Sequence, residues 1–253
     1  MAKSLPTRPE RILILGGTRE ARELASRLAA EGYGVITSLA GVTETPALPE
    51  GRLRRGGFGG VTGLARYLGE EAIACLIDAT HPFAAQMSQH AHDAATATGV
   101  PLLRLERPAW DPGAEDRWIG VGSVGAAVRA LPPGANAFVT IGRKDIAAFF
   151  ERGDVSGVAR MIEAPEVSPP PNWTILLARP PFNREAEIEL LAHHRITHVV
   201  AKNAGGEDTS AKIVAARRLR IPIVMIARPR KPDAPIFSTA KMLIPALRRV
   251  LLP

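Results

Sequence analysis

The chain alternates short, continuously apolar segments with longer segments in which apolar residues recur every three or four positions. Short apolar runs rich in β-branched residues predict strands, and the longer periodic segments predict amphipathic helices. Strands are expected at residues 11–15, 34–38, around 53, 74–79, 101–105, 137–141, 157–162, 174–178, 198–202 and 222–227. Helices are expected at residues 19–30, 61–70, 82–98, 124–130, 145–151, 184–194, 209–219 and 239–251. This alternation predicts parallel sheets that carry helices on both faces.

A change of composition divides the chain near its middle. Prolines gather between residues 107 and 134 around a polar stretch, and the apolar run at 137–142 then repeats the strand and turn that open the chain. We therefore expect an α/β protein with two Rossmann-like domains, each a parallel sheet flanked by helices, and a cleft between them. Residues 1–110 form the first domain, 111–134 a linker region and 135–253 the second domain, with the C-terminal helix a candidate to pack back on the first.

The first predicted strand breaks directly into a glycine turn that opens a helix. The residues of this turn are Gly16, Gly17, Thr18, Arg19 and Glu20. Glycines allow a tight turn and a close approach to a ligand, and the amino end of the following helix attracts anions. The spacing is not the G-x-G-x-x-G dinucleotide fingerprint, so the turn alone indicates a nucleotide, another anion, or an ordinary tight turn without a ligand.

The second predicted strand ends in hydroxyl residues, Thr37 and Ser38, about 20 residues after the glycines. An NAD site usually has Asp or Glu at this place, where the carboxylate binds the ribose 2′-hydroxyl. Its absence, with Arg19 nearby, favours NADP over NAD. The alternative is that no nucleotide binds and Ser38 only ends a strand.

The fourth predicted strand ends in the polar residues Asp78, Thr80 and His81, followed by Pro82. Asp78 lies in so apolar a segment that, if buried, it must be hydrogen-bonded or paired with a charge. His81 can donate to a ligand or move a proton, and Pro82 suits the first position of a helix. The alternative is structural: Thr80 or His81 caps the helix while Asp78 accepts from loop amides.

A comparable turn in the second half follows the strand at 198–202. Lys202 and Asn203 precede a glycine-bearing loop, and Lys212 lies one turn into the next helix. These lysines can hold substrate carboxylates or a phosphate, although such loops also occur without ligands.

Composition narrows the kind of protein. The chain has 46% hydrophobic and 23% charged residues, as expected of a globular protein. It has no apolar run near membrane-spanning length and no signal-peptide pattern in residues 1–10, so we expect a cytoplasmic protein. Its single cysteine, Cys75, lies in an apolar run and permits no internal disulfide. The net charge of +7 is scattered and aromatic residues make up only 5%, so we expect neither nucleic acid nor a membrane as partner. A solvated basic surface and a polyanionic small ligand both remain open, and the histidine spacings do not favour a metal site.

Several of these segments together resemble the precorrin-6A reductase family of cobalamin biosynthesis. The resemblance rests, in order along nearly the whole chain, on residues 16–20, 78–84, 140–142, 202–206 and 226–229. Asp-Ala-Thr-His-Pro-Phe-Ala at 78–84 is its most specific part. Ala204 stands where the family pattern has serine, and the Arg-Pro-Pro-Phe stretch at 179–182 has a proline where many members have glycine.

The resemblance implies an NADPH-dependent reduction of one double bond of the precorrin-6A macrocycle, giving precorrin-6B, without metal or flavin. It implies cofactor contacts from Gly16, Gly17, Thr18, Arg19, Glu20, Thr37, Ser38, Asp78, Thr80 and His81, with His81 as proton donor or positioning group beside Thr80. It implies substrate contacts from Arg143, Lys144, Lys202, Asn203 and Lys212. Two alternatives are another NADP-dependent oxidoreductase and a non-catalytic nucleotide-binding regulatory module. The oligomeric state and the presence of cobalt in the substrate stay open.

Overall fold

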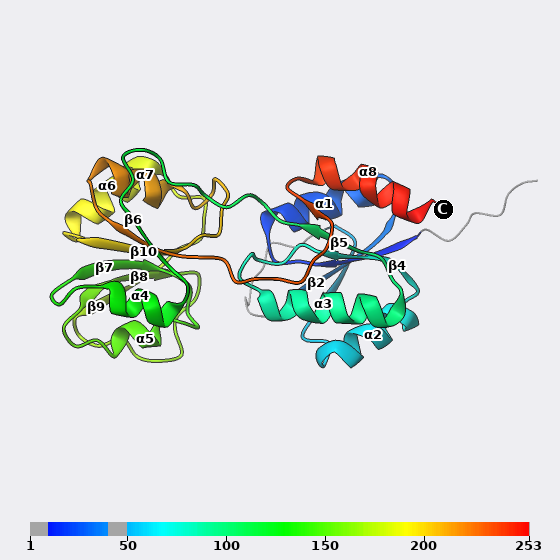
Figure 1. The fold of residues 1–253 in the computed structure, drawn as a ribbon, viewed down its shortest axis with the longest axis horizontal. Helices are drawn as coiled ribbons and strands as arrows, with labels where there is room; N and C mark the ends of the chain where they lie inside the picture. Colours follow the sequence, from blue (N-terminus) through cyan, green and yellow to red (C-terminus); the bar gives the residue numbers. More distant parts are fainter. Residues whose placement is uncertain (1–9, 40–49, 253) are drawn as a thin grey trace, which may run out of the picture. The chain divides into compact units, whose positions relative to one another are not determined.

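A computed structural model describes residues 10–39 and 50–252 of the 253-residue chain. The chain forms two compact units, Met1–Arg107 with Arg230–Pro253, and Pro108–Pro229. Each unit contains one six-stranded sheet, and every strand pair in both sheets is parallel (Figure 1). The prediction of an α/β protein with two Rossmann-like sheets is therefore confirmed.

The first unit has the strand order of a dinucleotide-binding fold. Its elements are β1 (Arg11–Leu15), α1 (Arg19–Ala30), β2 (Gly34–Leu39), β3 (Arg52–Arg55), α2 (Gly60–Glu70), β4 (Ile73–Asp78), α3 (Ala85–Thr98), β5 (Leu102–Leu105), β12 (Ile236–Phe237) and α8 (Ala240–Leu251). The sheet runs β12-β5-β4-β1-β2-β3. The order reverses between β1 and β4, and ligands of open parallel sheets bind beyond the carboxyl ends of strands at such a point.

The second unit repeats this order with different strands. Its elements are β6 (Trp118–Val121), α4 (Val124–Ala130), β7 (Asn136–Thr140), α5 (Ala147–Phe150), β8 (Ser156–Met161), β9 (Trp173–Leu177), α6 (Arg184–His193), β10 (His198–Lys202), α7 (Ala211–Arg218) and β11 (Ile223–Ile226). The sheet runs β6-β11-β10-β7-β8-β9. In each sheet, one edge strand is out of chain order. β12, which pairs with β5, follows the second unit in the chain, whereas β6, which pairs with β11, precedes β7.

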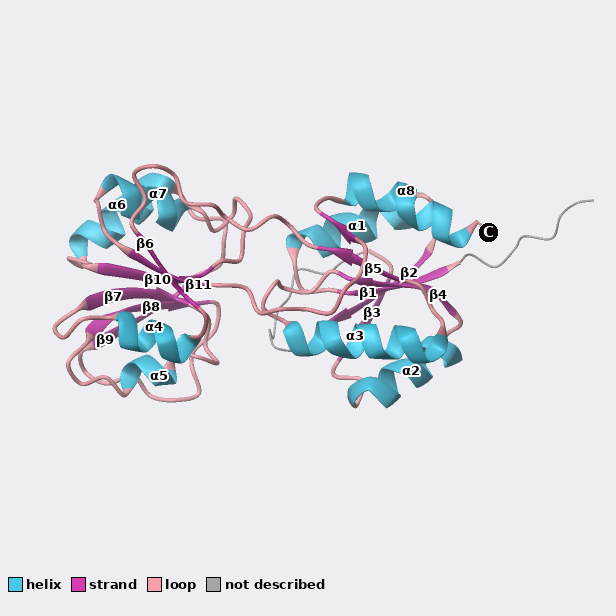
Figure 2. Cartoon of the chain, in the orientation of Figure 1, coloured by secondary structure: helices cyan, strands magenta, loops and turns pink. Residues whose placement is uncertain are grey.

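Both faces of each sheet are covered, which explains the continuous apolar runs of the sequence. In β1, alternate side chains point to opposite faces. Ile12 and Ile14 pack with α1 and α8, whereas Leu13 and Leu15 pack with α2 and α3. Figure 2 shows the corresponding layers in the second unit, with α6 and α7 on one face of the sheet and α4 and α5 on the other.

Three expectations differ from the structure. The helix expected from residue 82 begins at Ala85, because residues 82–83 form a turn first. The segment 111–134, expected as a linker, contributes β6 and α4 to the second unit. β6 and β12 were not predicted, since β6 contains Gly120 and lies at a sheet edge, and β12 has only two residues. The C-terminal helix α8 belongs to the first unit.

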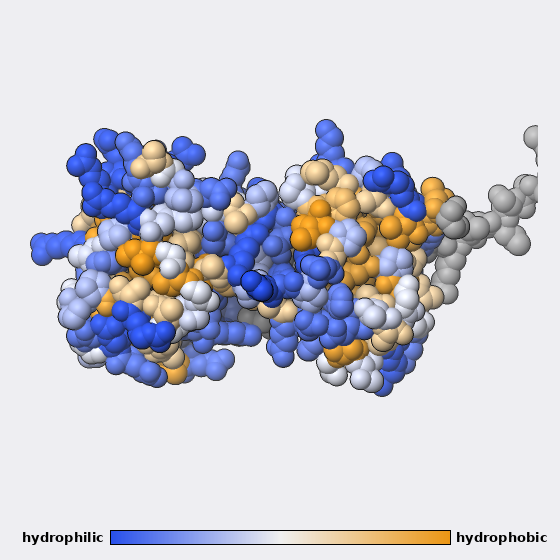
Figure 3. Space-filling model, in the orientation of Figure 1, coloured by the Kyte–Doolittle hydropathy of each residue, from blue (hydrophilic) through white to orange (hydrophobic). Residues whose placement is uncertain are grey.

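The visible surface of each unit mixes hydrophilic and apolar side chains (Figure 3). Within residues 10–39 and 50–252, no helix is long and apolar enough to cross a membrane. Residues 1–9, most of the segment for which no signal peptide is expected, lie outside the described part of the chain.

Candidate functional site

The glycine turn after β1 lies at the switch point of the first sheet. Gly17 has a φ of +113°, which glycine adopts readily, and a Cβ on Gly16 would lie 2.8 Å from Thr37 Cγ2. The Gly16 N–H donates to Ser38 O at 2.9 Å. Thr18 caps α1, because its Oγ1 accepts from Ala21 N at 3.1 Å, and the same hydroxyl donates to Ala79 O at 2.9 Å. The turn is thus held against the ends of both neighbouring strands, β2 and β4.

The first turn of α1 carries one charge of each sign. Arg19 is exposed, whereas Glu20 forms an ion pair with Arg107 at 3.0 Å. Glu20 was expected as a cofactor contact. In the structure, its carboxylate joins the start of α1 to the chain segment that follows β5.

At the end of β2, Thr37 and Ser38 are both buried. The register of β2 and β3 places Ser38 directly opposite Arg54. Arg54 Nη1 lies 3.5 Å from Ser38 Oγ, and no acidic residue occurs among the last residues of β2. The end of β2 therefore offers a hydroxyl beside a guanidinium.

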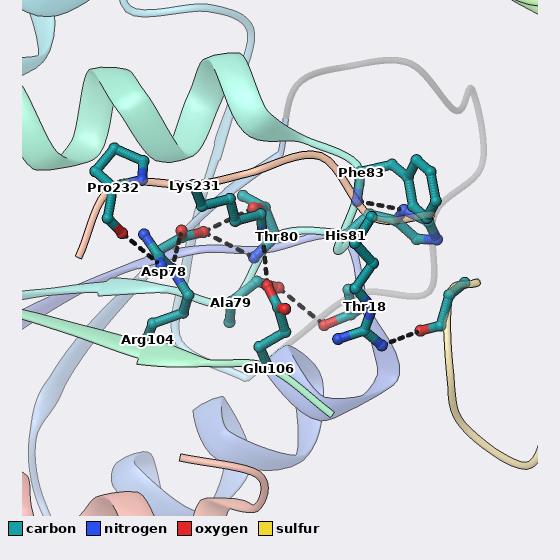
Figure 4. A network of polar contacts seen from close by, with 12 residues as sticks. Thr18, Asp78, Ala79, Thr80, His81, Phe83, Arg104, Glu106, Lys231 and Pro232 are labelled. Atoms are coloured by element: carbon teal, nitrogen blue, oxygen red, sulfur yellow. Dashed lines mark hydrogen bonds and ion pairs between the residues drawn. The ribbon is translucent and has the colours of Figure 1, made fainter. Parts of the chain in front are cut away.

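The end of β4 is built around a buried ion pair. Asp78 and Arg104 are paired in the register of β4 and β5, and they are only 1% and 2% exposed. Arg104 Nε donates to Asp78 Oδ2 at 3.1 Å, while Asp78 Oδ1 accepts from both N and Oγ1 of Thr80, at 3.2 and 2.7 Å (Figure 4). The prediction that a buried Asp78 needs partners is confirmed. The Asp78 carboxylate is enclosed and binds Thr80 of the loop that follows β4.

Opposing effects act on the Asp78 carboxyl. Burial alone would raise its pKa, but the hydrogen bond from Thr80 and the charges of Lys231 and Arg104 outweigh burial, and the pKa of Asp78 lies below its usual range. Asp78 therefore stays ionised at neutral pH.

The same network holds the chain segment that leads into β12. Arg104 Nη1 donates to Pro232 O at 2.9 Å, and Lys231 Nζ pairs with Glu106 Oε2 at 2.6 Å. Figure 4 shows these residues together with Asp78 and Thr80. The returning chain is thus fastened to β5 immediately beside the polar end of β4.

The hydrogen bonds of Thr80 and His81 define what each can offer a ligand. The Thr80 hydroxyl donates its proton to Asp78, so toward a ligand it can act only as an acceptor. His81 is exposed, and its Nδ1 accepts from the backbone N–H of Phe83 at 3.2 Å. The proton of the neutral ring is then on Nε2, which makes His81 a hydrogen-bond donor through Nε2.

The cations expected at the strand ends of the second unit have acidic neighbours. Lys202, at the end of β10, pairs with Asp145 at 2.6 Å, and Arg143, after β7, pairs with Glu163 at 3.5 Å. Lys144 is exposed. Lys202 ends β10, and Arg143 and Lys144 follow β7, which is the neighbour of β10 in the sheet.

Asn203 and Lys212 are turned toward the fold. Asn203 binds the backbone of Trp110 twice, accepting from its N–H at 2.8 Å and donating to its carbonyl at 2.9 Å. Lys212 is 5% exposed, donates to Thr209 O at 2.6 Å and lies 5.1 Å from the centre of the Trp110 ring. The sequence suggested substrate contacts for both, but the described contacts are those of an internal anchor for the loop after β10.

The single cysteine and the residue types that bind metals are the other groups with possible chemistry. Cys75 is buried, and burial raises the pKa of its thiol to about 12, so the thiol is not an activated nucleophile. Within the described ranges, no group of three or more His, Cys, Asp or Glu residues is placed to hold a metal ion.

The sequence pattern alone did not identify Arg54 or Arg104 as residues of the candidate site. Arg54 is one of several scattered arginines, and only the strand register brings it to Ser38. Arg104 carried a usable signal, because it is the one charged residue in the apolar strand Leu102–Leu105. A charge in such a strand requires a buried counter-charge, and Asp78 was the available one.

The two sheets and the switch-point turn define an α/β protein of the Rossmann-like class. The chain belongs to the family described as Precorrin-6x reductase CbiJ/CobK, whose model matches residues 11–248. A reductase requires a source of electrons, so the family implies a reducing cofactor.

Similar proteins span nearly the same length. The chain is 46% identical over 226 residues to the precorrin-6A reductase of Rhodococcus erythropolis, covering 88% of this chain and 91% of that protein. It is 45% identical over 231 residues to that of Rhodobacter capsulatus, covering 90% and 92%. A solved structure of CobK precorrin-6A reductase matches with a TM-score of 0.90 at 43% identity, covering 95% of this chain and 97% of that one.

Proposed function

We propose that this protein is an NADPH-dependent precorrin-6A reductase, which reduces one double bond of the macrocycle to give precorrin-6B in cobalamin biosynthesis. The observation that carries the reaction is the identity of 46% and 45% to two proteins named precorrin-6A reductase, extending over both units. The choice of cofactor is supported separately, by the donor groups at the strand ends of the first unit.

The first unit offers groups that suit a phosphorylated dinucleotide. A Cβ on Gly17 would meet nothing within 4 Å, and the amino end of α1 begins directly beyond it. Backbone N–H groups there, with Thr18 and Arg19, suit the diphosphate. The end of β2 has a hydroxyl and an arginine, Ser38 and Arg54, where a carboxylate would repel a 2′-phosphate.

When bound, NADPH supplies the hydride, and the chain supplies position and a dry environment. We assign Thr80 as an acceptor, because its hydroxyl donates its proton to Asp78, and His81 as an Nε2–H donor, because its Nδ1 accepts from the Phe83 N–H; both would orient the reacting groups. Asp78 and Arg104 hold the loop that carries both residues. The accompanying proton can come from His81 or from solvent.

The substrate is a polycarboxylate, and the second unit supplies cations for it. Arg143, Lys144 and Lys202 lie at the carboxyl ends of adjacent strands, and two of them already have an acidic partner. A substrate carboxylate would share or replace that partner. The exposed Lys144 is the cation that binding perturbs least.

Turnover tests the proposal. Purified protein with saturating NADPH should consume the cofactor only when precorrin-6A is added, at a rate proportional to protein concentration. Consumption with other unsaturated acceptors but not with precorrin-6A would favour a different oxidoreductase. Thermal stabilisation by NADPH without any consumption would favour a regulatory module.

A further inference from the structure

Residues 178–183, here called the strap, follow β9 at the carboxyl edge of the second sheet. The backbone N–H of Ala178 still donates to Met161 O of β8, at 3.0 Å. Four residues later, the N–H of Phe182 donates to Asp208 O at 3.1 Å, in the loop that follows β10. The strap therefore joins the ends of β8 and β9 to the loop after β10, although β7 lies between β8 and β10 in the sheet.

A buried ion pair anchors the far end of the strap. Arg160, in β8, is 7% exposed, and both its Nη atoms donate to the carboxylate of Glu187 in α6. The Phe182 ring covers this guanidinium, whose carbon lies 3.5 Å from the ring centre. Because Glu187 compensates the charge of Arg160, the pair gives Phe182 a fixed surface on which to stack. The strap is thus held at both ends.

Arg179 is the one charged residue of the strap, and it is exposed. Pro180 and Pro181 follow it. A proline ring fixes φ, and the residue before a proline is restricted to extended conformations. Arg179 therefore extends from a backbone with little freedom, so that a ligand can bind its guanidinium at a small cost in backbone entropy.

The position of Arg179 indicates which ligand it would bind. Lys202 ends β10, Arg143 follows β7, and Arg179 lies two residues beyond the end of β9, so all three belong to the carboxyl edge of one parallel sheet. Neighbouring strands lie about 4.8 Å apart, so the ends of β10 and β9, three spacings from each other, are separated by about 14 Å. Cations spread over such a distance suit carboxylates that are carried around a macrocycle.

We propose that Arg179 binds a carboxylate of the macrocyclic substrate, and that the anchored strap holds it in place for this contact. The inference rests on the proposed function and adds to it a substrate-binding residue on a third strand end. A guanidinium is always protonated and can give a carboxylate two parallel hydrogen bonds.

Steady-state kinetics of the complete protein test the role of Arg179. In Arg179→Gln, KM for precorrin-6A should rise at least about tenfold, as expected when a hydrogen bond between charged groups is lost, whereas KM for NADPH and the melting temperature stay at their wild-type values. Arg179→Lys keeps the charge without the planar pair of donors, so its KM should lie between those of wild type and Arg179→Gln. Added salt should narrow the difference between wild type and Arg179→Gln, because salt screens exposed charges.

Arg218→Gln is the matched control. It removes one positive charge from an exposed arginine in the last turn of α7, which leads to the amino end of β11 at the opposite edge of the same sheet. Both KM values should stay at their wild-type values in this variant.

The outcomes separate the inference from the function on which it rests. An unchanged KM for precorrin-6A in Arg179→Gln overturns the role of Arg179 and leaves the proposed function intact. A rise of both KM values together, or a rise that accompanies a lower melting temperature and does not respond to salt, also overturns it, because a merely structural role would have those effects. Wild-type protein that does not reduce precorrin-6A overturns the proposed function and the inference together.

Discussion

At the scale of single residues, the pairing of Asp78 with Arg104 organises the candidate site. The sequence alone indicated that a buried Asp78 needs a partner. It did not identify Arg104, which lies 26 residues later in the chain and reaches Asp78 only through the register of β4 and β5. The sequence does not define the roles of Thr80 and His81 for the same reason. It shows which polar groups are present, but not which of their protons already form hydrogen bonds.

Asp78→Asn should strongly destabilise the first unit. Removing one partner of a buried pair leaves Arg104 charged and uncompensated, at a loss of about 3–5 kcal/mol. Since the pKa of Asp78 is lower in the folded state, its stabilising contribution is fully present above the unfolded value of about 3.9 and is lost as the pH falls below it.

Calorimetry at several pH values checks this prediction. The difference in melting temperature between wild type and variant should be large at neutral pH and should narrow below about pH 4. Asp233→Asn, a change of an exposed aspartate in the same unit, should leave the melting temperature almost unchanged. A difference that stays constant down to acid pH would contradict the role given to the Asp78 carboxylate.

At the scale of elements, continuous apolar runs and helical periodicity are sufficient to predict most of the strands and helices. β1, α1, α4 and β10 begin and end where the pattern predicts, because each is bounded by a clear capping residue or turn. The pattern failed for β6 and β12, which are short edge strands whose pairing depends on distant segments. It also placed the start of α3 too early, since Pro82 suits a first helical position but here lies in a turn.

A chain that ends at residue 229 should lose the fold of the first unit while the second unit stays folded. The deletion removes β12 and α8, including the fully buried Leu243 and Leu247, and each such side chain contributes about 2–5 kcal/mol. That loss is comparable to the whole stability of a domain, about 5–15 kcal/mol.

Two spectroscopic signals distinguish the units in this experiment. The three tryptophans, Trp110, Trp118 and Trp173, all lie in the second unit, so their fluorescence reports on that unit alone. Tryptophan emission should remain native while the far-ultraviolet circular dichroism decreases. Retention of the full circular dichroism signal with cooperative unfolding would show that the C-terminal segment is not needed for the first fold.

At the scale of the whole molecule, the proposed function assigns the cofactor to the first unit and the cations for the substrate to the second. The first carries the switch-point turn, the Ser38 and Arg54 pair and the loop with Thr80 and His81. The second carries the cations proposed for the substrate. The sequence alone predicts this division, because the motifs recur after equivalent strands. It does not show that Asn203 and Lys212 also bind the backbone of Trp110 and Thr209.

Transfer of a label from the cofactor tests the central claim most directly. NADPH deuterated at both C4 positions is incubated with the protein and precorrin-6A, and the product is analysed by mass spectrometry. We predict a reduced macrocycle that carries one deuterium from the cofactor. A reduced product without the label, or no reduced product from active cofactor and intact substrate, would contradict the assignment of this protein as an NADPH-dependent precorrin-6A reductase.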